Sequence, residues 1–277
     1  MRIAYLGPAG TFSEEAALLY ASEGDELIPF SSFAALVSAV EADVADSAVL
    51  PIENSIEGSV SSTVDLLIHE TELQICREIV VPVHHCLVGA PGSNITGIKS
   101  VRTHPQAFGQ CRKFLDRCLP NAIQQAALST AGAVEDVSKG SDLTVAGIGT
   151  ARSAELYGGT ILARNIEDNH TNVTRFVALH ERDHAQTGND KTSLSVTVRQ
   201  NVPGSLHAVL DELAADKIQM TRLESRPAKH VLGEYYFLIE IEGHRLDPHI
   251  AAALERMRAK SDIFKVFGSY PKYVPSD

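Results

Sequence analysis

The sequence predicts an α/β protein with a second, smaller α+β part at its C-terminal end. In about the first two-thirds, short β-rich runs alternate with helical patterns, which favours mainly parallel sheets. A polar, apolar-poor segment at 181–191 is typical of a linker or exposed loop. Beyond it the order is strand, helix, strand, strand, helix, strand, which is the ferredoxin-like βαββαβ arrangement. The length of 277 residues also favours two domains.

The elements follow from these patterns in order. Strands are expected at 2–6, 27–30, 47–50, 73–81, 85–89, 123–127, 144–147, 160–163 and 174–179. Helices are expected at 13–22, 33–42, 60–69, 105–118 and 130–139. The second part is expected to hold strands at 192–198, 219–225, 235–242 and 263–269, and helices at 203–215 and 247–259. Pro203 is expected in the first turn of its helix, and Asp247 as an N-cap before Pro248.

Composition excludes several classes of function. The 24 basic and 35 acidic residues give a net charge of −11, which argues against nucleic acid as the main partner. No apolar run approaches the ~20 residues that span a bilayer, and the first residues lack the pattern of a signal peptide. We therefore expect a cytoplasmic protein without a membrane partner. Its four cysteines are expected to be free thiols. Because neither H-E-x-x-H nor a Cys/His finger spacing occurs, no metal is expected.

The first motif is Gly-Pro-Ala-Gly-Thr-Phe-Ser-Glu at 7–14, between a strand and a helix. Gly10 permits close backbone approach, and Thr11 or Ser13 can cap the helix. Free N–H groups at a helix start favour a bound anion. The competing interpretation is an ordinary capped turn. The spacing matches neither a dinucleotide fingerprint nor a phosphate loop.

The second motif, at 51–60, places a polar turn after a strand and before a helix. Glu53, Asn54 and Ser55 supply a carboxyl, an amide and a hydroxyl at the carboxyl end of that strand, where α/β sheets bind ligands. For these three residues the density of polar groups favours function. For Glu57 a solvated charge is the favoured interpretation.

Two further motifs are weaker. At 169–176 a polar loop enters a strand, where Thr174 offers a hydroxyl and Arg175 a guanidinium suited to a carboxylate. A surface cation is the alternative for Arg175, and Phe176 is expected in the core. At 103–111 a helix begins at a proline, with Gln106 and Gln110 one turn apart. Here a polar helix surface is the alternative.

Together these motifs resemble the prephenate dehydratase family, which makes phenylpyruvate on the route to phenylalanine. The resemblance covers nearly the whole chain. It rests on segments 7–14, 51–60 and 174–176, on the helix start at His104, and on Gly149-Thr150 before residues 154–158. It implies a fold like type II periplasmic binding proteins, with two lobes around a cleft, and a reaction without a cofactor.

The resemblance implies roles for particular residues. The expected catalytic residues are Thr174, Glu53, Asn54 and Gln110. The expected substrate-binding residues are Thr11, Ser13, Ser55, Thr103, Arg175 and Phe176. Thr174 would polarise the departing oxygen, and a protonated Glu53 could serve as the acid if burial raises its pKa. A position that is acidic in some members falls near Leu128.

The C-terminal part resembles an ACT regulatory domain. The residues implied to bind phenylalanine are Gly204, Ser205, Leu206, Glu224, Ser225, Arg226 and Pro227, with Ser205 standing where the family usually has alanine. The expected domains are a catalytic domain at 1–181, a linker at 182–191 and an ACT domain at 192–277. Within the catalytic domain, lobe one is expected at about 1–77 and 165–181, and lobe two at about 78–164.

The implied partners are prephenate and, as effector, L-phenylalanine bound between subunits of a homodimer or homotetramer. Because the chain starts at its first sheet strand, no preceding chorismate mutase domain is expected. Two alternatives stay open: an arogenate dehydratase, and a binding protein that holds a small molecule without chemistry.

Overall fold

The structure is a computed structural model that describes residues 1–200, 202–228 and 233–274. These residues divide into two compact units, 1–60 with 80–176, and 61–79 with 177–277. Across the described residues, no helix is long and apolar enough to cross a membrane.

The first sheet has the strand order β2-β1-β3-β11-β5, with β4 paired to β3. Its strands are β1 (Arg2–Leu6), β2 (Glu26–Phe30), β3 (Ser47–Asn54), β4 (Gly58–Ser59), β5 (Gln74–Pro82) and β11 (Val173–His180). The helices along this stretch of chain are α1 (Phe12–Tyr20), α2 (Phe33–Glu41) and α3 (Ser61–His69). β1 pairs in parallel with both β2 and β3, and its central residues are fully buried, as its apolar sequence predicts.

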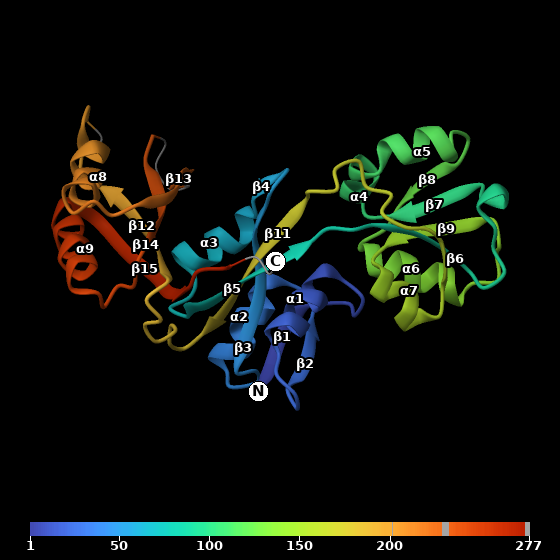
Figure 1. Ribbon diagram of the computed structural model, residues 1–277, viewed down its shortest axis with the longest axis horizontal. Coiled ribbons are helices and arrows are strands. Elements are labelled where there is room, and N and C mark those ends of the chain that lie inside the picture. Colours follow the sequence, from blue (N-terminus) through green and yellow to red (C-terminus); the bar gives the residue numbers. More distant parts are fainter. Residues whose placement is uncertain (201, 229–232, 275–277) are drawn as a thin grey trace. The chain divides into compact units, whose positions relative to one another are not determined.

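The second sheet has the order β10-β6-β9-β7-β8. Its strands are β6 (Cys86–Gly89), β7 (Ser100–Thr103), β8 (Ile123–Ala126), β9 (Val145–Gly149) and β10 (Thr160–Ala163). The helices are η1 (Ile95–Gly97), α4 (Pro105–Gln110), α5 (Arg112–Cys118), α6 (Thr130–Lys139) and α7 (Ala151–Tyr157). β9, β7 and β8 pair in parallel, whereas β6 pairs antiparallel with both of its neighbours, β9 and β10. α6 packs against β9, β6 and α7 (Figure 1).

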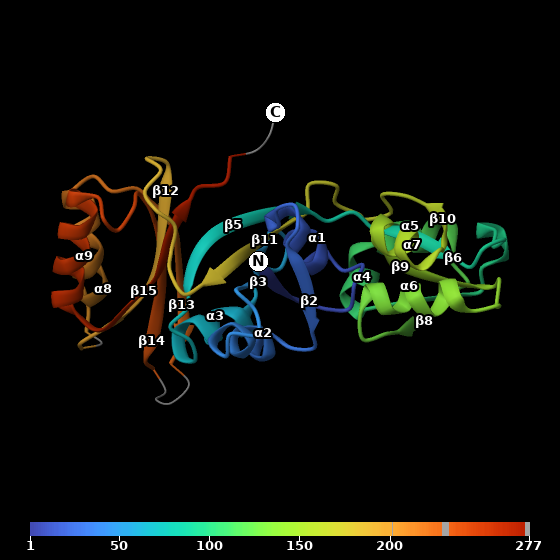
Figure 2. The ribbon, with the colours of Figure 1, turned by 90° about the horizontal axis from the view of Figure 1, so that it is seen from below.

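The third sheet is antiparallel, with the order β13-β14-β12-β15. Its elements follow along the chain as β12 (Asp190–Val198), α8 (Ser205–Ala215), β13 (Met220–Pro227), β14 (Tyr235–Glu242), α9 (Pro248–Lys260) and β15 (Ser261–Pro271). Figure 2 shows α8 and α9 on one side of this sheet. Leu194, Val196, Ile239 and Ile241 face the helices and form the core of this part.

Local chemistry explains where the sequence-based boundaries differ. The helix expected from Pro203 begins at Ser205, because Gly204 has φ +90 and interrupts helical geometry. Asp247 is the N-cap of α9 as expected, but its carboxylate accepts the N–H of His244 instead of a helix N–H. The helix expected at 105–118 is divided at Cys111 into α4 and α5.

The division into units differs from the expected domain boundary at residue 181. Residues 61–79 group with the C-terminal sheet because they contact it repeatedly. Lys265 Nζ donates to the Thr71 carbonyl at 2.6 Å, and Lys191 Nζ lies 3.0 Å from a Glu78 oxygen. Gly268 of β15 lies against Ile75 of β5 so closely that a Cβ there would stand 2.3 Å from the Ile75 carbonyl oxygen.

Candidate active site

A cavity of about 350 Å³ lies within the first unit, in the size range of small-molecule sites. The strand ends β3 and β11 and the helices α1, α4 and α6 contribute its walls. The residues that line it are Leu6, Thr11, Phe12, Ser13, Phe33, Pro51, Asn54, Val60, Val83, His85, His104, Gln106, Ala107, Gln110, Leu128, Ser129, Thr130, Thr174 and Phe176.

The hydroxyl of Thr174 is oriented by Asn54. The Asn54 amide Nδ2 donates to Thr174 Oγ1 at 2.9 Å and to Asn172 Oδ1 at 2.9 Å. On its other side, Asn54 Oδ1 accepts the N–H groups of Ile56 and Glu57, which fixes the orientation of the amide. Because Thr174 Oγ1 accepts from Asn54, its own proton is left to donate into the cavity.

Two helices begin at the cavity. Thr11 caps α1, and Ser129 caps α6 with its Oγ accepting the Gly132 N–H at 3.0 Å. A helix start presents N–H groups without intrahelical partners, together with the positive end of the helix dipole. None of the lining residues, which are all described, is Lys, Arg, Asp or Glu. Backbone dipoles are therefore the groups best placed to receive an anion in this cavity.

The tight turn of α1 against α7 depends on Gly10. This glycine has φ +84, and a Cβ would stand 2.8 Å from Ser153 Cβ. Across the same contact, Thr150 Oγ1 donates to the Gly10 carbonyl, and Arg152 pairs with the buried Glu14. These interactions hold the α1 start in place at the cavity.

The histidine at position 85 anchors one wall. His85 is only 2% exposed, and its ring meets Phe12 edge to face. Its Nε2 lies 2.8 Å from Gln110 Oε1, while Gln110 Nε2 donates to a Glu57 oxygen at 3.0 Å. Gln106 Nε2 donates to the second Glu57 oxygen at 2.5 Å. Glu57 is exposed, as the interpretation of a solvated charge requires, and its carboxylate also orients both glutamines.

Comparison with known proteins bears on what this cavity does. A sequence model of the prephenate dehydratase family matches residues 3–184. A bifunctional chorismate mutase/prephenate dehydratase of Neisseria gonorrhoeae is 42% identical over 274 residues, covering 99% of this chain and 75% of that protein.

The chain belongs to the prephenate dehydratase family.

Solved structures agree with this assignment. The structure of prephenate dehydratase in complex with L-Phe from Arthrobacter aurescens is 36% identical, covers 98% of this chain and 90% of that one, and has a TM-score of 0.89. A structure described as GqqA, a novel type of quorum quenching acylase, is 33% identical, with coverages of 99% and 98% and a TM-score of 0.88. The mixed α/β fold with several sheets is thus shared with structures of prephenate dehydratases.

Six of the ten residues expected at the prephenate dehydratase site line the cavity. They are Thr11, Ser13, Asn54, Gln110, Thr174 and Phe176. Sequence reasoning missed His85, Ser129 and Thr130 as site residues. The serine that caps α6 carried a signal, since it follows a strand and precedes a helical pattern. No local pattern indicated His85, because its Gln110 partner is distant in sequence.

Glu53 and Arg175 do not line the cavity. Their side chains pair with each other, with Arg175 Nη2 2.7 Å from Glu53 Oε2. Arg175 lies between Thr174 and Phe176, which both line the cavity, and successive side chains of a strand point to opposite faces. The cavity lining gives no support to the expectation that both face the substrate, which stays a prediction. The expected acid role of Glu53 has no support from its position.

Ser55 and Thr103 also lie outside the cavity lining. Ser55 Oγ accepts the Val173 N–H and donates to Asn172 Oδ1, so it helps to order the start of β11. Thr103 is fully buried and donates to the Ile148 carbonyl between β7 and β9. The polar turn expected after β3 is a β3–β4 hairpin turn, in which Asn54 Oδ1 accepts N–H groups of the turn. Both residues serve the structure around the site.

The buried carboxylate of Glu167 supports the wall that carries His85. It accepts the His85 N–H at 2.9 Å, and His84 and His170 lie within hydrogen-bond distance. Burial acts to raise the pKa of Glu167, but the hydrogen bonds from His84, the His85 N–H and His170 outweigh it and lower the pKa to about 2.

The lowered pKa of Glu167 predicts an acid-sensitive contribution to stability. The ionised carboxylate stabilises the folded state fully above the ordinary pKa of 4.5, and this stabilisation is lost as pH falls toward the folded-state value of about 2. The free energy of unfolding of the wild type, measured with denaturant, should therefore fall more steeply over this range than that of Glu167→Gln. Parallel pH curves for the two proteins would contradict this expectation.

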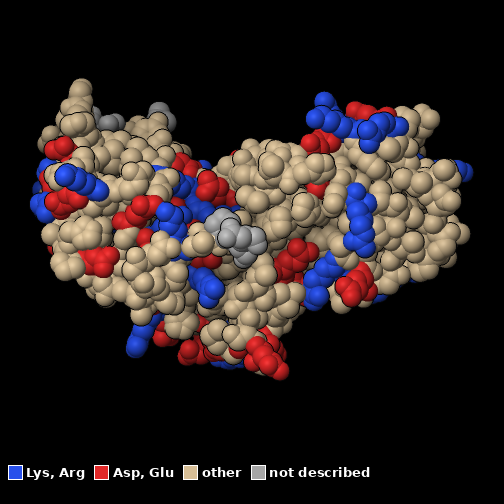
Figure 3. All heavy atoms as spheres, viewed as in Figure 1, with Lys and Arg blue, Asp and Glu red and all other residues tan. Residues whose placement is uncertain are grey.

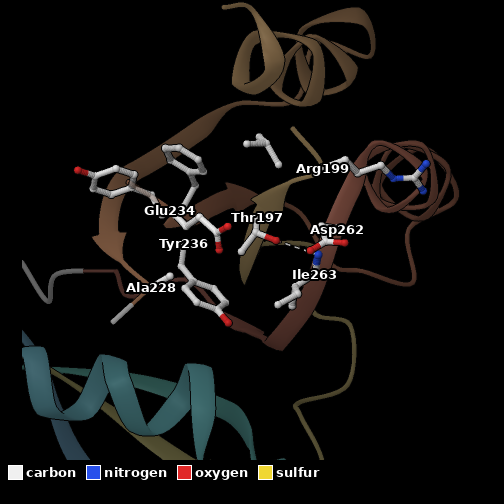
Figure 4. Close-up of a pocket in the computed structure, with 10 residues that line it drawn as sticks. Thr197, Arg199, Ala228, Glu234, Tyr236, Asp262 and Ile263 are labelled. Atoms are coloured by element: carbon white, nitrogen blue, oxygen red, sulfur yellow. Dashed lines mark hydrogen bonds between the residues drawn. The ribbon is translucent and has the colours of Figure 1, made fainter. Parts of the chain in front are cut away.

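A second cavity, of about 130 Å³, lies in the C-terminal part (Figure 4). It is formed by the end of β12 and the starts of β14 and β15, where Thr197 Oγ1 accepts the Ile263 N–H at 2.9 Å. The residues expected to bind phenylalanine are not among its lining residues. Gly204 is the N-cap of α8, and the Glu224 carboxylate of β13 pairs with Arg222 and Arg226.

Charges do not mark a nucleic-acid surface on the face shown in Figure 3, where Lys and Arg side chains are interspersed with Asp and Glu. In the described parts of the chain, no group of three or more His, Cys, Asp or Glu residues could hold a metal ion.

Proposed function

We propose that the chain is a prephenate dehydratase, a carbon–oxygen lyase that converts prephenate to phenylpyruvate with loss of carbon dioxide and water. The observation that carries the proposal is the Thr174 hydroxyl, held by Asn54 in a cavity with two helix N-termini. Family membership supports it. The same geometry suits a dianion, because helix dipoles bind carboxylates without a basic side chain.

The cavity residues have separate tasks in this reaction. As the C–O bond breaks, the electrons of the leaving carboxylate enter the ring, and the departing oxygen needs a proton to become water. Thr174 donates a hydrogen bond to that oxygen, which polarises the bond. The starts of α1 and α6 receive the carboxylates. Aromatisation of the ring drives the reaction, so modest acid assistance suffices.

The domain organisation and regulation extend this proposal. The catalytic domain comprises 1–181, with two lobes as in type II periplasmic binding proteins, followed by a linker and an ACT domain at 192–277. The βαββαβ order of the C-terminal elements supports the ACT assignment. We propose that L-phenylalanine binds between ACT domains of a homodimer or homotetramer, near Gly204 and Glu224. The complex of the Arthrobacter relative with L-Phe supports this effector.

The purified chain tests the proposal directly. Incubated with prephenate, it should form phenylpyruvate, whose absorbance in alkali gives the rate, and L-phenylalanine should change the KM or kcat. Arogenate is assayed in parallel for phenylalanine formation. Faster turnover of arogenate would reassign the substrate, and no turnover of either compound by folded protein would refute the proposed activity.

A further inference from the structure

A row of ion pairs crosses the face of the C-terminal sheet that is turned away from α8 and α9 (Figure 2). Ile239 and Leu194 face those helices, so Glu240 of β14 and Lys191 of β12 project from the opposite face. Arg222 of β13 is the register partner of Glu240 and shares its face. Because β13, β14 and β12 are neighbours in that order, the three strands place these charged side chains in sequence across the sheet.

The contacts alternate in sign from β13 to β5. Arg222 Nη2 lies 2.8 Å from Glu224 Oε2, and Arg222 Nη1 lies 3.2 Å from Glu240 Oε1. Lys191 Nζ lies 3.4 Å from the other Glu240 oxygen and 3.0 Å from Glu78 Oε2. We call these five side chains, Glu224, Arg222, Glu240, Lys191 and Glu78, the ion-pair row. The row connects the carboxylate near which we propose L-phenylalanine to bind with a carboxylate of β5.

Burial determines how strongly these charges depend on one another. The Glu78, Glu240 and Lys191 side chains are 2%, 6% and 12% exposed. Charges with so little water around them are weakly screened, and each depends on its neighbours for compensation. Glu224 is the most exposed member, at 25%, so a ligand in solvent can reach it. A charge bound at Glu224 should therefore alter the pairing of the members behind it.

Arg222 is the side chain that two carboxylates share. An amino-acid ammonium group at Glu224 pairs with the same carboxylate and weakens the hold of Glu224 on the guanidinium, so Arg222 pairs more closely with Glu240. Glu240 then holds Lys191 less strongly across the longest contact of the row, and Lys191 pairs more closely with Glu78. We propose that the ion-pair row couples L-phenylalanine binding to β5, an inference that rests on the proposed effector site.

Glu78 has the position in β5 that this coupling requires. Its Oε1 accepts the Tyr273 N–H at 2.6 Å while Oε2 contacts Lys191, so one carboxylate fixes β5 to two segments of the C-terminal unit. Directly after β5, Val83 lines the cavity that holds Thr174. A change in how Lys191 holds Glu78 therefore acts on the strand that leads to the reacting groups.

Glu240→Gln removes the charge at the centre of the row and keeps the shape of the side chain. Both ends stay paired, because Arg222 still contacts Glu224 and Lys191 still contacts Glu78. We expect kcat and KM without effector, and the dissociation constant of L-phenylalanine measured by calorimetry, to stay within about 3-fold of wild type. The factor by which saturating L-phenylalanine changes kcat/KM for prephenate should fall about 3-fold or more.

Glu242→Gln is the matched control. Glu242 lies on the same strand and the same face as Glu240, but it is 41% exposed and pairs with Lys272 outside the row. Its variant should keep the wild-type factor. A wild-type factor in Glu240→Gln, or an equal loss in Glu242→Gln, would overturn the proposal.

Two further outcomes are distinct from these. Wild-type protein that turns over prephenate but neither binds nor responds to L-phenylalanine would refute the proposed effector, and this inference with it. If Glu240→Gln fails to fold, the ¹⁵N resonance of the Lys191 ammonium in the wild type decides. L-phenylalanine should shift that resonance and leave the resonance of Lys272 in place, and an unshifted Lys191 resonance would overturn the proposal.

Discussion

Replacing Thr174 with valine should lower kcat for prephenate by about 10²- to 10⁴-fold, the contribution of one positioned proton donor. Valine has the shape of threonine without the hydroxyl, so the β11 backbone is unchanged. Asn54 Nδ2 keeps two other acceptors, Asn172 Oδ1 and the Val173 carbonyl. Because substrate still meets the helix N-termini, KM should change much less than kcat.

Thr174→Ser is the matched control, since it keeps a hydroxyl in place. It should retain most of the turnover, measured by the initial rate of phenylpyruvate formation. Circular dichroism and thermal unfolding verify that both variants fold. A folded valine variant that turns over prephenate at nearly the wild-type rate would remove Thr174 from the mechanism.

Replacing Gly268 with alanine should destabilise the C-terminal unit severely. Gly268 has φ +140, and an added Cβ would stand 2.3 Å from the Ile75 carbonyl oxygen and 2.7 Å from its nitrogen. The backbone atoms of β5 that the Cβ would meet cannot withdraw as the end of a flexible side chain can. Overpacking and backbone strain together should cost about 3 kcal/mol or more, which lowers the unfolding midpoint by about 6–12 °C.

Gly188→Ala provides the comparison for this prediction. Gly188 also has positive φ, +85, but nothing lies within 4 Å of the position of its Cβ. The alanine there incurs only the backbone cost of about 1–2 kcal/mol. Thermal unfolding of the two variants should therefore separate the cost of the steric clash at Gly268 from the cost of a positive φ for alanine. Similar midpoints for both would show that β5 and β15 can move apart at Gly268.

Much of the fold could be predicted because the local signals agree with it. The apolar runs of β1 and β11 and the caps of α1 and α9 are visible in sequence. β7 (Ser100–Thr103) was missed because its short run, Ser-Val-Arg-Thr, alternates too briefly to show a period. The grouping of 61–79 with the C-terminal sheet depends on contacts such as Lys265 with Thr71, which no local pattern encodes.

Site residues could be predicted from the sequence where a motif residue also has its side chain directed at the cavity. Thr174 and Asn54 were predicted and lie together in the cavity, whereas their neighbours Arg175 and Glu53 pair with each other and are not among its lining residues. Chemical type had placed Arg175 with a carboxylate ligand, but strand alternation directs it toward the protein's own carboxylate. To predict this, one must know which face of the sheet each side chain occupies, and a motif alone does not give that.

Two strands pass from one unit into the other without a break. Residues of β5 up to Ile79 belong to the C-terminal unit, and the chain then leads to Val83 and His85 of the cavity. β11 (Val173–His180) carries Thr174 and Phe176 of the cavity and continues from there into the second unit. If the proposed effector shifts these strands in the C-terminal unit, the shift would reach the reacting groups through the backbone of the same strands. Thermodynamic reciprocity then requires that prephenate alter the effector's affinity by the same factor, which calorimetric titration of an inactive variant can measure.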